Sequence, residues 1–307
     1  MRIAALTGAT GFLGARLGLA LRERGWSVRA LVRRPADETA LRRDGYETVA
    51  GDLADSAAMA ALAHGADAVV HCAGLIKAAD RAAFMAVNRD GAARLAAATS
   101  GRMVLISSLA AREPGLSDYA ASKRAGEEAV GAALGARAVT IRPPVIYGPG
   151  DRETLALFRL ALRWLVVPVP ADGAARLALA HADDVAEAVA DVLERPEIHG
   201  VYAVGGARSE GYGWSEILRA ATRAVNRRPA LLPVPGWAVS AAAAVSETLG
   251  RAGGGAPIFT GGKAREMRHA DWAVRPDERV PGAPAARFDL DLGFADAVKW
   301  YRAAGWL

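Results

Sequence analysis

Short apolar runs alternate with segments of helical periodicity along the first half of this chain. Uninterrupted apolar runs are typical of strands that are buried on both faces of a sheet. The regular order of strand and helix predicts right-handed crossovers and a parallel sheet with helices on both faces, which is an α/β architecture. Strands are predicted at residues 3–6, 26–32, 47–50, 68–72, 103–106 and 138–141, and helices at residues 15–24, 54–64 and 88–98.

Three glycines, Gly8, Gly11 and Gly14, lie between the first predicted strand and the first predicted helix. Gly8 allows a tight turn, Gly11 lets backbone N–H groups approach a pyrophosphate, and Gly14 lets the helix pack closely on the strand. The helix N-terminus then offers unpaired N–H groups to the phosphates. A glycine triplet alone is equally compatible with a structural turn, but this position favours a dinucleotide site in a Rossmann-type doubly wound sheet. The candidate contacts at this turn are Gly8, Thr10, Gly11, Phe12, Leu13 and Gly14.

Arg33 and Arg34 follow the second predicted strand. NAD-selective proteins place an acidic residue near this point, against the ribose hydroxyls. A carboxylate would repel a 2′-phosphate, whereas a guanidinium group binds one. The two arginines therefore favour NADP as the cofactor, with NAD as the alternative. They would be ordinary solvated loop residues if they made no cofactor contact.

Further candidate contacts follow the third and fourth predicted strands, because ligands of open parallel sheets bind beyond the carboxyl ends of the strands. Asp52 is suited to accept a hydrogen bond from the adenine amino group, or to cap the helix that follows it. His71 lies inside an apolar run and is interpreted as a packed strand residue rather than a catalytic group. Asn88 either caps a helix or binds backbone or water inside the domain. The candidate cofactor contacts here are Asp52, Leu53, Ala73 and Gly74.

Ser107 and Ser108 end the fifth predicted strand, and Tyr119 and Lys123 follow at the start of a helix. Positions i and i+4 lie on one face of a helix. A tyrosine has a reference pKa near ~10, and a neighbouring ammonium group lowers that value by favouring the phenolate. The Ser108 hydroxyl can hold a substrate hydroxyl or carbonyl oxygen beside the phenol. Tyr-x-x-x-Lys alone occurs often by chance, but its combination with the strand-end serines and the glycine turn favours an acid–base site of Ser108, Tyr119 and Lys123.

The glycine turn (residues 7–14), Gly51-Asp52-Leu53, Asn88, the serine pair, the Tyr119/Lys123 pair and residues 142–150 together resemble the extended short-chain dehydrogenase/reductase family. This family contains NAD(P)-dependent epimerases and dehydratases and 3β-hydroxysteroid-dehydrogenase-like reductases. The resemblance implies a Ser/Tyr/Lys triad in which Ser108 is the catalytic serine. It also implies that Lys123 binds the nicotinamide ribose. The further cofactor contacts that it implies are Ser107, Tyr119, Pro143, Val145 and Ile146.

Two departures from the family's patterns bear on the reaction. Sugar-nucleotide epimerases of the family usually carry a longer insertion before the tyrosine, where this chain has only residues 109–118. Its dehydratases carry an acidic pair beside the serine, where this chain has Leu109-Ala110-Ala111. These departures favour an oxidoreductase that exchanges hydride with a hydroxyl or carbonyl carbon of a small, fairly apolar substrate. The alternatives are a sugar or sugar-nucleotide epimerase of the same family and a non-catalytic NAD(P)-binding assembly or sensor protein.

The second half of the chain is expected to build a small substrate lobe. We expect a dinucleotide-binding core at residues 1–150 and the lobe mainly at residues 151–307, with segments near 176–204 returning to the core. His181 and Asp184 are expected to bond the backbone and cap a helix that runs through residue 193. Residues 231–249 are expected to form a Pro-bounded loop and an apolar helix over the substrate, with a dimer face or a membrane-surface contact as alternatives. The glycines at 253–255 are a candidate lid hinge.

Composition narrows the classes of protein that fit. The 307 residues are enough for one large domain with a smaller lobe. The net charge is +5, but no run of five basic residues occurs, so nucleic-acid binding is not expected. Cys72 is the only cysteine, which excludes an internal disulfide and a cysteine-based metal site, and no metal is expected. We find no signal peptide and no apolar stretch of bilayer length, so a cytoplasmic protein is expected, with a homodimer left open.

Overall fold

The computed structural model describes residues 2–170, 175–252 and 260–307. Its internal contacts divide the chain into two units. The first unit comprises Met1–Pro143, Ala186–Ala203 and Val280–Pro284, and the second comprises Pro144–Val185, Val204–Arg279 and Ala285–Leu307. The candidate hinge at 253–255 lies outside the described residues. No described helix combines the length and the apolar character that crossing a bilayer requires.

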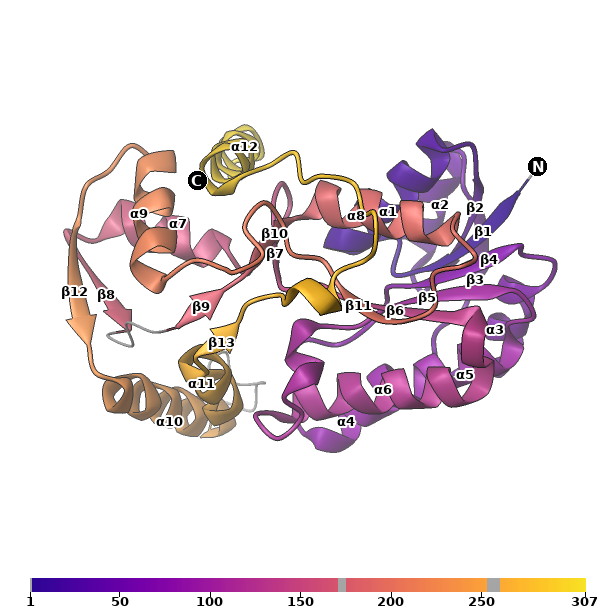
Figure 1. Cartoon of the computed structure of the whole chain (residues 1–307), viewed down its shortest axis with the longest axis horizontal. Coiled ribbons are helices and arrows are strands. Elements are labelled where there is room, and N and C mark those ends of the chain that lie inside the picture. The colour runs from indigo at the N-terminus through magenta and orange to yellow at the C-terminus, as the bar shows by residue number, and fades with distance from the viewer. Residues whose placement is uncertain (1, 171–174, 253–259) are drawn as a thin grey trace. The chain divides into compact units, whose positions relative to one another are not determined.

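The first unit contains a seven-stranded sheet in which every neighbouring pair is parallel, which confirms the predicted α/β fold (Figure 1). β1 lies between β2 and β4, so the chain adds β2 and β3 on one side before it crosses to the other. The glycine turn after β1 therefore lies at the point where the strand order reverses, where doubly wound sheets bind their ligands. The strand order is β11 (Gly200–Ala203), β6 (Ala138–Arg142), β5 (Arg102–Ile106), β4 (Ala68–His71), β1 (Ile3–Thr7), β2 (Ser27–Val32) and β3 (Glu47–Ala50).

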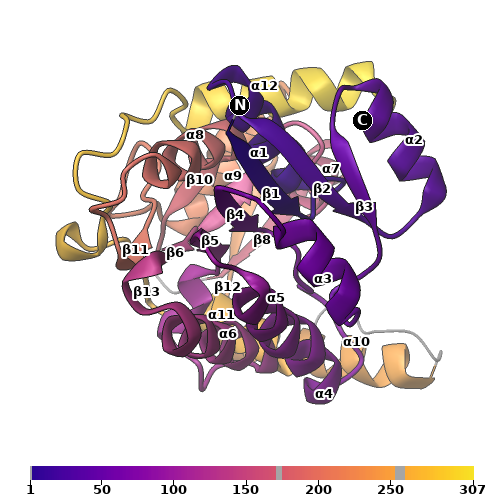
Figure 2. The same ribbon diagram turned by 90° about the vertical axis from the view of Figure 1, so that its right-hand side faces the viewer.

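Helices cover both faces of this sheet (Figure 2). On one face, buried side chains of three helices, among them Met59, Leu95 and Val130, pack against strand residues such as Val69 and Met103. This cluster forms because the strands present branched apolar side chains and the helices present Leu, Met and Ala at helical spacing. That face carries α3 (Ser56–Ala63), α5 (Ala92–Ala98) and α6 (Asp118–Leu134), and the other carries α1 (Phe12–Glu23) and α8 (Ala182–Leu193).

Shorter helical elements complete the first unit. α2 (Pro35–Arg43) was not expected as a helix, because it is polar and none of its residues is buried. α4 (Arg81–Met85) leads into a π-helical turn at Ala86–Gly91, and 3₁₀ turns lie at Leu109–Arg112 and Gly135–Arg137.

The second unit is built around aromatic side chains. Phe294 contacts both Tyr147 and Phe158 edge-on, with ring centroids 5.0 and 5.1 Å apart, and Tyr301 packs beside Phe158. Its strands are β7 (Val145–Tyr147), β8 (Val166–Pro170), β9 (Arg176–Leu177), β10 (Leu179–His181), β12 (Ala230–Val234) and β13 (Asp271–Trp272). Its helices are α7 (Leu155–Arg163), α9 (Trp214–Ala224), α10 (Gly236–Ala252), α11 (Gly261–Arg268) and α12 (Leu290–Ala303), with a 3₁₀ turn at Pro276–Glu278.

Two expectations for the second unit hold only in part. The start of the expected Pro-bounded loop is a strand, β12, which pairs in parallel with β8 over its whole length. His181 and Asp184 both bond the backbone, as expected, and Nδ1 of His181 accepts from the N–H of Asp183 at 3.3 Å in the first turn of α8. Asp184 does not cap this helix, because its carboxylate accepts hydrogen bonds from the backbone N–H groups of Arg287 and Phe288, more than a hundred residues away. The sequence near Asp184 carries no sign of that distant partner.

Candidate functional site

In the glycine turn, the backbone packs so closely that side chains at Gly8 and Gly14 would clash with it. Gly8 has a φ of +79°, and a Cβ at this position would lie 2.8 Å from the backbone nitrogen of Ala73. A Cβ on Gly14 would lie 1.8 Å from the carbonyl oxygen of Gly8, so only glycine allows α1 to pack here. Gly11 occupies the N-cap of α1 and brings no side chain to it. The first N–H groups of α1 are thus suited to bind an anion, and this glycine cradle fits a dinucleotide pyrophosphate.

Gly74 connects this turn to the predicted catalytic lysine. A Cβ at Gly74 would lie 3.0 Å from Oδ1 of Asn88 and 3.5 Å from Nζ of Lys123. Ala73 is the chain neighbour of Gly74 and lies against Gly8. Four residues that were singled out separately in the sequence, Gly8, Ala73, Gly74 and Lys123, are therefore contiguous at the carboxyl ends of β1 and β4.

Lys123 is buried, and its Nζ donates a hydrogen bond to the carbonyl oxygen of Ile106 at 2.7 Å. Burial lowers the pKa of Lys123 to about 8, with the nearby Cys72 and Glu127 opposing this shift. Burial and the charge of Lys123 together lower the pKa of His71 to about 3, so this imidazole is neutral near pH 7. An ammonium group has three donors and the bond to Ile106 occupies one, so Lys123 is held in place while retaining donors for a ligand.

Asn88 fastens the segment after β4 to the start of α6. Its Oδ1 accepts from the N–H of Leu75 at 2.8 Å, and its Nδ2 donates to the Leu75 carbonyl at 3.0 Å and to Oγ of Ser122 at 2.9 Å. Ser122 in turn donates to the carbonyl oxygen of Tyr119 at 2.8 Å. Of the two roles considered for Asn88, the structure supports backbone binding inside the domain. The residue thereby orients the helical turn that carries Tyr119 and Lys123.

Tyr119 and Lys123 lie one turn apart in α6. Tyr119 is half-buried, and its ring centroid lies 6.1 Å from that of Phe84. Ser108 is also half-buried, and its hydroxyl oxygen accepts from the N–H of Ala110 at 3.2 Å, which caps the 3₁₀ turn that follows. The N–H of Leu109 donates to the carbonyl of Pro143 at 2.8 Å, which anchors the segment after β5 to the end of β6.

Ser107 belongs to a buried ionic network that the sequence analysis missed. Its hydroxyl donates to Oε1 of Glu127 at 2.5 Å, and the same carboxylate accepts from Nε and Nη2 of Arg142 at 2.8 and 2.5 Å. A buried carboxylate needs such partners, because an unpaired charge is costly in a low-dielectric interior. The only signal in the sequence was the position of Glu127, four residues after Lys123 and thus on the same helical face.

The residues predicted at the adenosine end lie in different surroundings. Arg33 is exposed, while Arg34 donates to both carboxylate oxygens of Asp37 at 2.7 and 3.1 Å. Asp52 accepts from the N–H of Ala54 at 2.7 Å, but the N-cap of α3 is Asp55. Capping therefore belongs to Asp55, and Asp52 turns the chain just before it.

The other predicted cofactor contacts fall into three groups. Leu53 packs against Gly91, whose added Cβ would lie 3.0 Å from the Leu53 Cβ. Thr10, Phe12 and Leu13 lie in the glycine turn and the first turn of α1. Pro143 ends a segment of the first unit, whereas Val145 and Ile146 belong to β7 of the second unit.

Comparison with known proteins identifies the class of protein that this fold and site define. A model of the NAD dependent epimerase/dehydratase family matches residues 4–205, and the chain belongs to this family. It is therefore an enzyme of the NAD-dependent oxidoreductase and epimerase class.

Three individual proteins show how far the similarity extends. The chain is 44% identical over 308 residues to a ceramide reductase of Caulobacter vibrioides, covering 99% of this chain and 96% of that protein. The crystal structure of gox2253 superposes with a TM-score of 0.78 at 24% identity, over 100% of this chain and 99% of the other. A Thermus thermophilus UDP-glucose 4-epimerase in complex with NAD gives 0.71 at 21% identity, over 99% and 100% of the two chains. The two structures share the fold with this chain.

Proposed function

We propose that this protein is an NADP(H)-dependent reductase that converts a ketone to a secondary alcohol on a ceramide-type lipid. The observation that carries the proposal is the position of Lys123. This lysine is buried and anchored on the Ile106 carbonyl, lies beside Gly74, and follows Tyr119 by one helical turn. A lysine is rarely buried without a partner or a function, and this one lies beside Gly74 and follows Tyr119 in the same helix.

The proposed chemistry assigns each group one task. A bound reduced nicotinamide supplies a hydride to the carbonyl carbon of the substrate. The Tyr119 phenol donates its proton to the carbonyl oxygen, so that the ketone gains one hydride and one proton. The ammonium group of Lys123 stabilises the phenolate that is left until solvent returns the proton. The Ser108 hydroxyl donates a hydrogen bond to the same carbonyl oxygen and orients it toward the phenol.

The substrate class rests on the similarity to the ceramide reductase of Caulobacter vibrioides. Ceramide reductase is 44% identical to this chain over 99% of it, which makes a shared substrate class the simplest expectation. Ceramides are N-acylated long-chain amino alcohols with a secondary hydroxyl group, and the ketone that corresponds to this hydroxyl is what a Ser/Tyr/Lys site would reduce. A largely apolar substrate also agrees with the short segment between Ser108 and Tyr119, where sugar-nucleotide epimerases usually carry an insertion.

The preference for NADP rests on Arg33 and Arg34. Both follow β2 directly, at the end of the sheet where a ribose 2′-phosphate would lie in this fold. Arg34 forms an ion pair with Asp37. Arg33 is exposed and has no ion-pair partner among the residues that the structure describes, so its guanidinium group is the more accessible of the two. We therefore assign the main 2′-phosphate contact to Arg33.

The proposal is tested with purified protein, NADPH and a short-chain ketone analogue of ceramide. Tyr119→Phe should lower kcat by about 10²–10⁴-fold, which is the usual contribution of a positioned acid or base, while NADPH binding stays within a few-fold of the original. Tyr46→Phe makes the same chemical change just before β3 and should leave kcat unaltered. Full turnover by the Tyr119→Phe variant would contradict the acid role. An epimerase would interconvert its substrate with no net consumption of NADPH, which would contradict the reductase assignment.

A further inference from the structure

One face of the two-stranded β8–β12 sheet is apolar and exposed. The register pairs Val166 with Ala230 and Pro168 with Leu232, and paired residues share a face of a sheet. All four of these residues are exposed, whereas the alternate positions Val167 and Val169 are buried against α7 and α9. Figure 1 shows these two helices on one side of the β8–β12 ribbon. The other side is therefore an apolar surface.

Large exposed hydrophobic side chains also flank the two strands in the chain. Trp164 and Leu165 directly precede β8 and are 62% and 84% exposed, and Trp237 at the start of α10 is 73% exposed. Single exposed hydrophobic residues are common, but several on and directly beside one small sheet mark a candidate interaction surface. We call this group the β8–β12 face; it comprises Trp164, Leu165, Val166, Pro168, Ala230, Leu232 and Trp237.

Arginines border the same face. Arg163 ends α7 next to Trp164, and Arg227 in the turn before β12 donates to the carbonyl of Leu162 at 3.1 Å. The N–H of Ala230 donates to the Leu165 carbonyl at 2.8 Å, which brings the Arg227–Arg228 turn beside Leu165. Residues 163–170 and 226–237 contain three arginines and no acidic residue. The apolar surface is thus bordered by uncompensated positive charge in its own segments.

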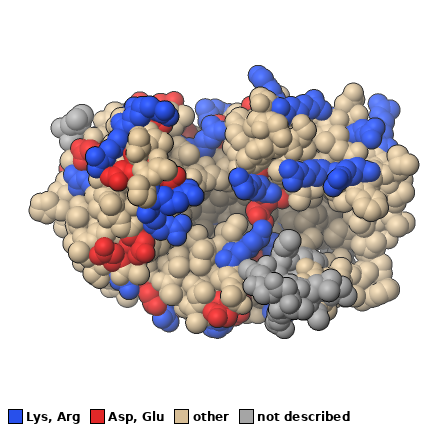
Figure 3. Space-filling view, turned by 180° about the vertical axis from the view of Figure 1, so that it is seen from behind, with Lys and Arg blue, Asp and Glu red and all other residues tan. Residues whose placement is uncertain are grey.

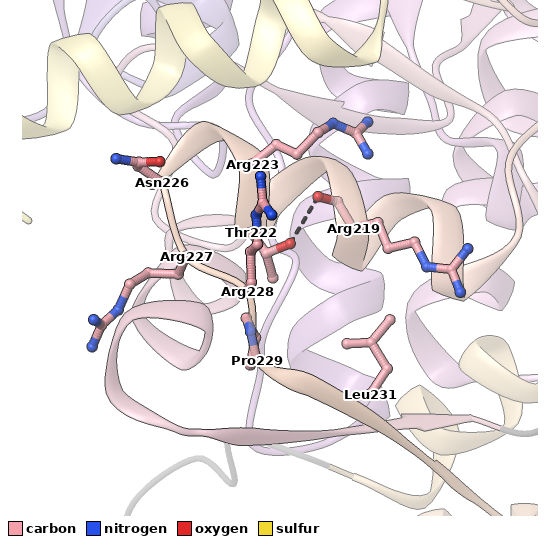
Figure 4. A pocket seen from close by; sticks show the side chains of 8 residues that line it. All are labelled: Arg219, Thr222, Arg223, Asn226, Arg227, Arg228, Pro229 and Leu231. Carbon is pink, nitrogen blue, oxygen red and sulfur yellow. Dashed lines mark hydrogen bonds between the residues drawn. The ribbon is translucent and has the colours of Figure 1, made fainter.

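The arginines of this region do not converge on a single point. A pocket of about 480 Å³ beside the turn is lined in part by Arg219, Arg223, Arg227 and Arg228. Figure 4 shows their guanidinium groups spreading in different directions, and Arg223 is paired with Asp291 at 2.6 Å. The view from behind shows basic side chains in several separate groups (Figure 3). Diverging cations suit an extended anionic surface better than one small anion.

We propose that the β8–β12 face docks on the surface of an anionic phospholipid bilayer. Tryptophan, leucine and arginine together are the composition of interfacial segments, because the apolar groups enter the acyl boundary while the guanidinium groups bind phosphates. A second copy of the chain fits less well, since a two-fold contact would place like-charged arginines against one another. A nucleic acid fits less well too, because the face offers only Trp164 and Trp237 for base stacking, and its other exposed side chains, such as Leu165 and Leu232, are aliphatic. This inference goes beyond the proposed reductase activity and does not depend on it.

Vesicle sedimentation tests this proposal without cofactor or substrate. The protein should bind vesicles of phosphatidylcholine with phosphatidylglycerol at least tenfold more tightly than vesicles of phosphatidylcholine alone. Because each arginine near an anionic surface contributes about 1 kcal/mol, the double variant Arg163→Gln/Arg228→Gln should lose about tenfold or more in affinity. Trp164→Ala/Leu165→Ala should lose a similar amount. The matched controls Leu19→Ala on α1 and Arg43→Gln on α2 are exposed in the first unit and should bind as the original does.

Several outcomes would overturn the proposal. These are equal binding to both kinds of vesicle, no binding to either, or arginine variants that bind as tightly as the original protein. Loss of a dimer in the tryptophan–leucine variant without any change in vesicle binding would assign the face to a second copy. Binding of a short DNA duplex that the arginine variants lose, with vesicle binding unchanged, would assign it to nucleic acid. If the tryptophan–leucine variant does not fold, the arginine variant alone decides the result.

Discussion

Arg142 and Glu127 form a buried ion pair, and removing one member should cost far more than removing both. Their side chains are 13% and 4% exposed, and two hydrogen bonds of 2.8 and 2.5 Å join them. Arg142→Met would leave the Glu127 carboxylate in the interior with the Ser107 hydroxyl as a neutral partner. Breaking a buried pair in this way typically costs about 3–5 kcal/mol of unfolding free energy.

The double variant Arg142→Met/Glu127→Met removes both charges and leaves mainly the Ser107 hydroxyl without its acceptor. That loss is worth about 1–3 kcal/mol, so the double variant should be more stable than Arg142→Met alone. Arg124→Met is the matched control, because Arg124 pairs with Glu128 at 3.0 Å on the exposed side of the same helix. It should cost less than about 1 kcal/mol.

Urea unfolding followed by far-ultraviolet circular dichroism measures all three variants against the original protein. The expected order of midpoints is the original protein and Arg124→Met highest, then the double variant, then Arg142→Met. A double variant that is at least as destabilised as Arg142→Met alone would refute the reasoning. An Arg142→Met variant that unfolds together with the control would do so as well, since it would mean that solvent reaches the Glu127 carboxylate.

Other features of the first unit give three further predictions. Gly14→Ala should abolish NADPH binding in a fluorescence titration, because the new Cβ would lie 1.8 Å from the Gly8 carbonyl oxygen. The control Gly131→Ala, where a Cβ on α6 meets open space, should bind NADPH normally. Normal binding by both variants would contradict the assignment of the glycine turn to the cofactor. Arg33→Ala should weaken NADPH binding about tenfold or more and NADH binding little, and equal losses would remove its 2′-phosphate role. Burial lowers the pKa of Lys123 from its reference value of 10.5 to about 8. Between these two pH values the unfolded state binds more protons than the folded state. The free energy of unfolding should therefore rise with pH across this window, by about 3 kcal/mol in total. Urea midpoints should show this rise in the original protein and not in Lys123→Met, and identical pH profiles would contradict the shift.

The sequence was most informative where a local pattern determines the structure. The glycine turn was predictable because the positive φ of Gly8 and the contact of Gly14 with the Gly8 carbonyl both arise within a single strand–turn–helix unit. The order of strands and helices was predictable because buried parallel strands are continuous apolar runs. Helix α2 was missed for the opposite reason, since it buries no residue and so shows no apolar stripe.

Long-range partners were beyond sequence reasoning. Asp184 looks like a helix cap, but its acceptors serve the backbone at residues 287–288. Glu127 looks like one of two surface glutamates, and only the fold places Arg142 and Ser107 against it. The pairing of β12 with β8 joins segments more than sixty residues apart, and β12 contains a proline that weakens any strand prediction. In each case the missing information is a contact between segments distant in the chain.

The central claim is that hydride passes from NADPH to a ketone carbon of the substrate at the Tyr119 site. The most direct measurement uses NADPH deuterated at the transferred position, with a short-chain ketone analogue of ceramide and mass spectrometry of the product. We predict an alcohol that carries a single deuterium on the new carbinol carbon, formed at a rate that Tyr119→Phe lowers by about 10²–10⁴-fold. A product without deuterium, or the same rate from Tyr119→Phe, would contradict the account.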